Sequence, residues 1–198
     1  NIFNCRQWLV IKGGSNAYIP KIIAGCKNKI LISTPVSKVI RSKNSVEVFY
    51  GKDFASHQFD KVIFATHSDQ ALALLEDPSE EEVKILGSLP YQKNVALLHT
   101  DSSILPKKKI TWSSWNYLLS GDQSKPVTLT YNMNILQSLK SKTNFLVTLN
   151  SNGDVDTSKI IKTLVYHHPL FTVKGVKAQK EKNKISGVNN TFYCGAYW

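Results

Sequence analysis

Apolar runs alternate with turn-forming residues over the first thirty positions. The apolar run at residues 9–11 predicts a short strand, and Gly13-Gly14 predicts a turn directly after it. Ser15 and Asn16 are both suited to cap the helix expected next, and Pro20 fits its first turn. One face of this helix carries four apolar residues: Ile19, Ile22, Ile23 and Cys26.

Three β-rich segments follow, at residues 30–33, 36–41 and 46–50. Turn chemistry separates them at Thr34-Pro35 and at Lys43-Asn44. The spacing predicts a small antiparallel meander.

An unbroken apolar run at residues 61–65 predicts a strand buried on both faces. Residues 66–69 are expected to turn the chain into a helix that bears Ala71, Leu72, Leu74 and Leu75, and Pro78 ends this helix. A second helix begins at Ser79, which forms a capping box with Glu82, so we interpret the acidic run 80–82 as helix capping.

The second half reads as a further sheet, with strands at residues 95–100, 111–118, 127–132 and 145–149. Asp156 or Thr157 then caps a predicted helix whose apolar face is Ile160, Ile161, Leu164 and Val165. A lysine-rich strand and loop lead to a last strand at 190–198. We therefore expect an α+β fold with a mixed or antiparallel sheet and flanking helices.

Composition excludes several classes of protein. The chain has 198 residues, starts at Asn1 and has neither a signal segment nor an apolar run that would span a membrane, which favours a cytoplasmic protein. Cys5, Cys26 and Cys194 are odd in number and lack CxxC spacing, which argues against disulfides and a zinc site.

The formal net charge of +11 raises the question of an anionic partner. Arginine is scarce, with only Arg6 and Arg41, and the lysine clusters 107–109 and 174–184 do not alternate with aromatic residues. We therefore expect the lysines to be ordinary solvent-exposed surface residues, and we expect no nucleic-acid binding. If a basic patch is used, an anionic lipid headgroup is the first candidate, which allows peripheral contact with the inner membrane face.

No hydrolytic or metal-binding motif is present. His167-His168 precedes Pro169 and lacks the i, i+4 spacing of a helical ligand pair, while His57 and His99 stand alone. GxSxG, HExxH, the P-loop and a complete GxGxxG are all missing. No catalytic residue is assigned and no metal is expected.

Four segments together resemble flavin-containing amine oxidases: IKGGSNAY (11–18), LISTPVSKVI (31–40), FDKVIFAT (59–66) and TFYCGAYW (191–198). Five further matches resemble bacterial FAD-binding proteins associated with cyclopropane-fatty-acid synthases: ATHSDQAL (65–72), LLHTD (97–101), WSSWNY (112–117), TYNMN (130–134) and CGAYW (194–198). The resemblance implies hydride transfer from a substrate to FAD. The substrate implied is a lipid acyl chain or an amine.

In that family, backbone groups at Val36 would hold the adenine, and Ala65-Thr66 would pass near the pyrophosphate. Gly195 would lie beside the ribityl chain and phosphates. The N-terminal GxGxxG unit and the segment after the Gly195 motif are missing, so FAD is expected in a longer protein and not in this chain alone. Such a piece exposes sheet edges, and self-association is expected.

The resemblance also divides the chain. Residues 1–29 would link the domains, residues 30–75 and 190–198 would be part of a two-dinucleotide-type FAD domain, and residues 76–189 would form the substrate domain. Candidate substrate-pocket residues are aromatic: Trp112, Trp115, Tyr117 and Tyr131. Packing within the sheet explains them equally well. The alternative function is a non-enzymatic basic α+β module that binds anionic lipid or nucleic acid.

Overall fold

A computed structural model describes residues 9–119 and 127–198, which places Cys5 and Arg6 outside the described residues. The fold is α+β, as predicted, and the chain divides into two compact units. The five-stranded unit contains residues 1–29 and 93–167, and the two-sheet unit contains residues 30–92 and 168–198. The assignment of the predicted domains to cofactor or substrate stays a prediction.

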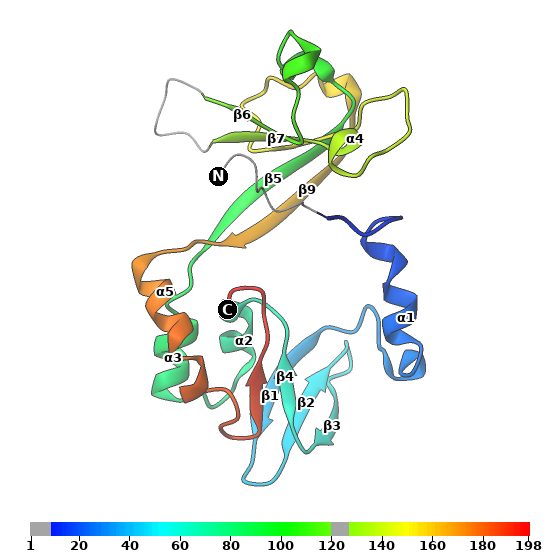
Figure 1. Cartoon of the computed structure of the whole chain (residues 1–198). Helices are drawn as coiled ribbons and strands as arrows, with labels where there is room; N and C mark the ends of the chain where they lie inside the picture. Colours follow the sequence, from blue (N-terminus) through cyan, green and yellow to red (C-terminus); the bar gives the residue numbers. More distant parts are fainter. Residues whose placement is uncertain (1–8, 120–126) are drawn as a thin grey trace. The chain divides into compact units, whose positions relative to one another are not determined.

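The two-sheet unit contains an antiparallel meander and a separate parallel strand pair (Figure 1). The meander has the order β1-β2-β3 and the pair joins β4 to β10. The strands are β1 (Val36–Arg41), β2 (Val46–Tyr50), β3 (Ala55–Phe59), β4 (Val62–Phe64) and β10 (Thr191–Tyr193). The helices are α2 (Ser68–Leu74), α3 (Glu80–Leu86), α5 (Val173–Lys180) and the 3-10 turn Lys182–Lys184.

The core of this unit lies where β1, β4 and β10 meet the helices. Phe64 of β4 stacks on Tyr193 of β10, with ring centroids 5.6 Å apart. α3 and α5 pack closely because α5 presents Gly175 and Ala178, and a Cβ on Gly175 would lie 3.3 Å from a Leu89 methyl group.

A buried ionic network ties three distant segments of the unit together. The guanidinium of Arg41 donates to both carboxylate oxygens of Glu82, at 2.5 and 3.0 Å. The Tyr193 hydroxyl donates to Glu82 Oε1 at 2.7 Å, and Asp77 binds Arg41 from the other side. Burial alone would raise the pKa of Glu82, but these hydrogen bonds and the charge of Arg41 lower it, so the carboxylate is ionised.

The five-stranded unit is built on one sheet with the order β6-β7-β8-β5-β9. Its strands are β5 (Tyr91–His99), β6 (Trp115–Leu118), β7 (Thr128–Asn132), β8 (Leu146–Leu149) and β9 (Ile160–Pro169). Its helices are α1 (Ile19–Ile23) and α4 (Met133–Leu136). Single 3-10 turns lie at Ser15–Ala17, Lys27–Lys29, Ser102–Ile104, Lys109–Thr111 and Thr157–Lys159.

The meander exists, but one of its predicted strands was wrong. Residues 30–33 are irregular, and the third strand is instead β3, residues 55–59. Every β3 residue is exposed, so this edge strand carries no apolar alternation by which it could be recognised. The apolar run 9–11 is also not a strand.

Two assignments near the end of the chain were also wrong. Residues 160–169 form strand β9, where a helix was predicted, and residues 173–180 form helix α5, where a strand was predicted. Apolar pairs spaced four residues apart fit one helix face, yet β-branched residues at 160, 161 and 165 favour the sheet edge that β9 occupies.

Other local predictions held. The capping box of Ser79 and Glu82 is formed, and Pro20 lies in the first turn of α1. β4, however, is not buried on both faces, because Ile63 is 66% exposed. Within the described residues β4 pairs only with β10, which leaves that apolar side chain uncovered.

Candidate functional site

An open apolar pocket of about 530 Å3 lies against strands β1 and β4 of the two-sheet unit. Valines and small residues make most of its wall, and β1, β2 and β4 supply the valines. The lining residues are Pro35, Val36, Val39, Val48, Val62, Ile63, Phe64, Ala65, Thr66, Gln70, Ala73 and Leu74. Three of the four predicted cofactor-binding residues, Val36, Ala65 and Thr66, therefore line a single pocket.

Strand β1 is irregular at the position where Val36 enters the pocket. The register of β1 against β2 shifts between Val36 and Lys38, so Ser37 has no Cα partner in the ladder. Bulges of this kind recur beside functional sites because they re-aim the backbone. The irregularity falls on the stretch whose backbone was predicted to hold an adenine ring.

The parallel pairing of β4 and β10 brings the fourth predicted residue, Gly195, next to Thr66. The amide of Cys194 donates to the carbonyl of Phe64 at 2.9 Å, which continues the ladder past the last strand residue. A Cβ on Gly195 would lie 2.7 Å from the Thr66 carbonyl oxygen and 2.1 Å from the Tyr197 ring. Only glycine fits there, although Gly195 does not itself line the pocket.

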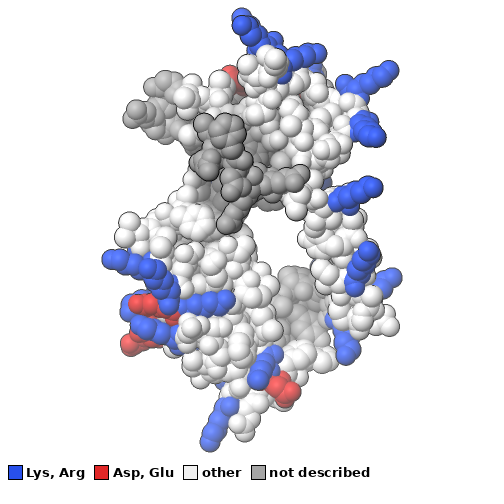
Figure 2. Space-filling view, viewed as in Figure 1, with Lys and Arg blue, Asp and Glu red and all other residues white. Residues whose placement is uncertain are grey.

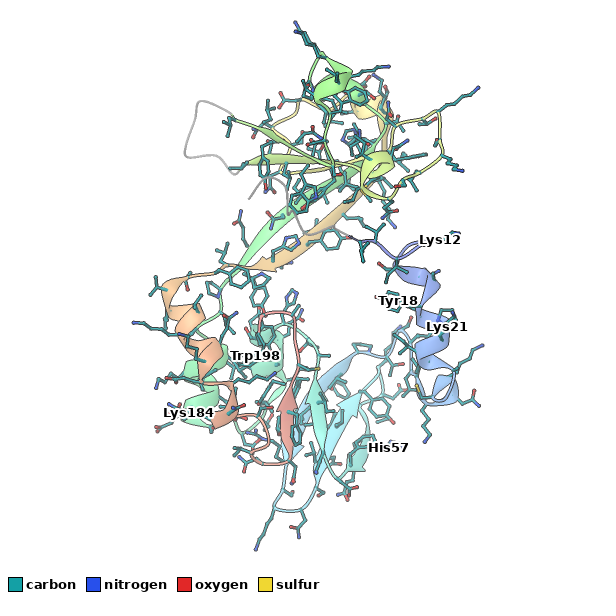
Figure 3. All side chains as sticks on the ribbon, viewed as in Figure 1. Lys12, Tyr18, Lys21, His57, Lys184 and Trp198 are labelled. Atoms are coloured by element: carbon teal, nitrogen blue, oxygen red, sulfur yellow. The ribbon has the colours of Figure 1, made fainter. Side chains whose placement is uncertain are left out.

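Buried polar groups gather where these two strands end, and no sequence motif had indicated them. Ser68 Oγ is buried without a hydrogen-bond partner among the described residues, and the buried polar atoms Tyr197 Oη and Trp198 Nε1 belong to neighbouring rings whose centroids are 4.9 Å apart. Burial raises the pKa of Tyr197 well above its usual value. The ammonium of Lys182, in the 3-10 turn after α5, lies 5.3 Å from the centroid of the ring of Trp198, which is labelled in Figure 3. None of Ser68, Tyr197 and Trp198 lines the pocket itself.

The side chains that line the pocket are apolar or uncharged, so they offer packing contacts and backbone groups rather than acid–base catalysis. His67 follows the lining residue Thr66 in the chain but does not line the pocket, and its ring stacks on Tyr91 with centroids 4.3 Å apart. His57, labelled in Figure 3, lies on the exposed strand β3 and faces the Tyr50 hydroxyl. Over residues 9–119 and 127–198, no group of three His, Cys, Asp or Glu residues is arranged to hold a metal. The arrangement suits binding of a largely apolar group and its orientation.

The predicted aromatic residues of the substrate domain fall in two places. Trp115 and Tyr131 are register partners on β6 and β7, in edge-to-face contact at 6.3 Å, and Tyr117 follows on the same face. Trp115 and Tyr117 line an open pocket together with Leu9, Val10 and Leu136. Burial raises the pKa of Tyr131. Trp112 lies apart, after a 3-10 turn, where its indole donates to the Pro106 carbonyl.

Comparison with known proteins identifies structural neighbours only. No protein-family model and no curated protein matches the sequence. The fold is similar to a fatty acid isomerase from P. acnes that produces CLA (13% identity, TM-score 0.61, 92% of this chain and 47% of that one). It is also similar to putrescine oxidase bound to putrescine (9%, 0.62, 93% and 47%) and to cyclohexylamine oxidase from Brevibacterium oxydans (11%, 0.54, 90% and 45%).

These neighbours are flavin amine oxidases and related FAD oxidoreductases. At such low identity the likeness shows the fold alone. The chain spans less than half the length of each neighbour.

Proposed function

We propose that this chain supplies one side of an FAD site in a longer oxidoreductase of amine-oxidase type. The observation that carries the proposal is the parallel pairing of β4 with β10. It brings Gly195 beside Thr66, where Ala65, Thr66 and Val36 line one apolar pocket. When bound, FAD would accept a hydride from the substrate, and residues of this chain would hold and orient the cofactor.

The residues present fit that cofactor in shape and chemistry. Ala65 and Thr66 follow the last residue of β4 and are exposed to the pocket, so the backbone is open to a pyrophosphate. Valine side chains at 36, 39 and 48 offer a flat apolar wall for an adenine ring. In this proposal a GxGxxG unit elsewhere in the longer protein would supply the other half of the nucleotide site.

As the substrate, we propose a lipid acyl chain in preference to an amine. The described residues of both pockets offer apolar and aromatic walls, and no carboxylate lines either pocket to pair with an ammonium group. Trp115, Tyr117 and Tyr131 are the proposed substrate contacts. Self-association of the isolated chain remains part of this proposal, because Ile63 and the free edge of β4 are exposed.

The cofactor proposal is tested on the protein translated from the whole reading frame. Ala65→Leu places a larger side chain in the pocket and is expected to abolish flavin absorbance in the purified protein. Ala55→Leu is the matched control, because Ala55 is exposed on β3 and does not line the pocket. Equal flavin content in the two variants would contradict the assignment of this pocket.

A second candidate function is contact with an anionic membrane through α5. Lys174, Lys177 and Lys180 are exposed on this helix and form no ion pair among the described residues, while Val173 is 76% exposed beside them. Figure 2 shows basic side chains projecting over the visible face, with acidic ones at only a few places. No helix in the described ranges is long and apolar enough to cross a membrane.

Sedimentation with vesicles tests this second candidate. Phosphatidylglycerol vesicles are expected to retain the chain at low salt and to release it as salt screens the lysines. Lys177→Glu/Lys180→Glu should lose retention, whereas Lys107→Glu/Lys108→Glu, an equal charge change elsewhere, should keep it. Loss in both variants would indicate a non-specific charge effect and contradict the α5 surface.

A further inference from the structure

A second cavity, of about 430 Å3, lies entirely within the five-stranded unit. It faces the side of the sheet opposite Trp115 and Tyr131, because Asn116 and Thr130 are register partners one position along each strand. Its walls are apolar at Leu105, Leu118 and Val155. Its floor is polar, formed by three buried threonines: Thr128, Thr130 and Thr148.

Beneath this floor lies His99, whose ring is held in one tautomer. The side chain is 0% exposed, and the backbone amide of Asp101 donates to its Nδ1 at 3.1 Å. Burial lowers the pKa of His99, although the charge of Asp101 opposes that shift, so the ring is neutral. A neutral ring that accepts at Nδ1 carries its hydrogen on Nε2.

The tautomer fixes the direction of the first hydrogen bond that runs to the cavity. His99 Nε2 lies 2.8 Å from Thr148 Oγ1 and must donate to it. The hydroxyls of Thr148 and Thr130 share one further hydrogen bond, at 2.9 Å, which uses the hydrogen of one of them. The other hydroxyl of the pair still has a hydrogen to donate, and among the described residues the two hydroxyls make no further hydrogen bond.

The pair of hydroxyls on Thr130 and Thr148 therefore offers one donor at the cavity floor. Thr130 and Thr148 are 4% and 0% exposed, and a buried donor without an acceptor costs about 1–3 kcal/mol. The neighbouring groups are already engaged, since Thr128 donates to the Asn150 carbonyl and the Asn116 amide donates to the Ser113 carbonyl. An acceptor atom inside the cavity would satisfy the remaining hydrogen.

We propose that this cavity binds a small apolar molecule through a neutral carbonyl oxygen, that of an ester, amide or ketone, which accepts from the hydroxyl pair of Thr130 and Thr148. Lys107 and Asp154 both line the cavity and are both exposed, so their opposite charges favour neither an anion nor a cation. Leu105, Leu118 and Val155 would contact the alkyl part. This site lies within the five-stranded unit and does not depend on the proposed flavin site.

The test is a titration of the whole chain with methyl hexanoate, followed by methyl NMR. Thr130→Val/Thr148→Val keeps the volume but removes both hydroxyls, and it should bind about five- to tenfold more weakly. Thr130→Ser/Thr148→Ser keeps both hydroxyls and should bind as wild type does. Wild-type binding by the double valine variant would overturn the proposed hydrogen bond, and equal weakening by the double serine variant would assign the threonines a purely structural role.

A measurement on the unmodified chain covers the case in which a variant does not fold. Nuclear Overhauser contacts are expected between the methyl hexanoate alkyl chain and the methyl groups of Leu118 and Val155. Contacts to Leu136 instead would place the ester in the pocket on the opposite sheet face. That result, or no saturable shift at all, would overturn the proposal.

Discussion

Replacement of Glu82 by alanine should destabilise the two-sheet unit strongly. Glu82 joins three segments far apart in sequence, because it accepts from Arg41 on β1, from Tyr193 on β10 and from Ser79 at its own helix cap. The side chains of Arg41 and Glu82 are only 1% and 2% exposed. Removing one member of such a pair leaves the other charge buried with too few partners.

The expected magnitude follows from that burial. Loss of one partner of a buried ion pair typically costs about 3–5 kcal/mol. Asp77 still binds Arg41 in the variant, but its side chain is 48% exposed and replaces only part of the lost interaction. Since a domain is stable by about 5–15 kcal/mol, the unit should approach unfolding.

Hydrogen exchange followed by mass spectrometry separates the two units in one experiment. Peptides from residues 30–92 and 168–198 should lose protection in Glu82→Ala, while peptides from residues 93–119 and 127–167 should change little. Glu81→Ala is the matched control, because this neighbour is half exposed and its ion pair with Lys84, at 3.9 Å, contributes well under about 1 kcal/mol. A uniform loss, or equal effects of the two variants, would refute the reasoning.

The lowered pKa of Glu82 has a further consequence for that experiment. A carboxyl whose pKa is lower in the folded state stabilises the fold above its unfolded pKa, and that contribution disappears as pH falls through the folded value. The wild-type unit should therefore lose protection in acid. Glu82→Ala should show a weaker dependence on pH over the same range.

Two other predictions concern His99 and Gly195. Because burial lowers the pKa of His99, the unfolded chain binds a proton more readily, so the five-stranded unit should lose stability below about pH 6.5; His99→Gln should flatten this loss in a series of thermal melts. Gly195→Ala should cost about 1–3 kcal/mol, since its methyl group overlaps the Thr66 carbonyl and the Tyr197 ring; Gly25→Ala, with open space around it, should be near neutral in urea denaturation, and equal midpoints would contradict this packing.

Local signals in the sequence were sufficient where an element depends on its own residues. The capping box at Ser79 and the strands at 36–41 and 46–50 are formed, because caps, turns and alternation act over a few positions. The edge strand β3 and the strand β9 were missed. Whether these residues form strands depends on their pairing with distant segments rather than on their own pattern of apolar and polar residues.

The candidate site was predictable only in part for the same reason. Val36, Ala65 and Thr66 were named from a family resemblance, and the structure places them in one pocket. The capping role of Glu82 was predicted, but its bonds to Arg41 and Tyr193 span 41 and 111 positions and leave no local signature. The hydrogen bond from His99 to Thr148 likewise joins residues 49 positions apart and leaves no local signature in the sequence.

The flavin content of the intact protein tests the central claim most directly. The protein translated from the whole reading frame should purify with FAD bound, or take up added FAD, and should show a flavin absorbance spectrum that is not expected of these 198 residues alone. Ala65→Leu should remove that spectrum and Ala55→Leu should not. An intact, folded protein that neither carries nor binds FAD would contradict the account.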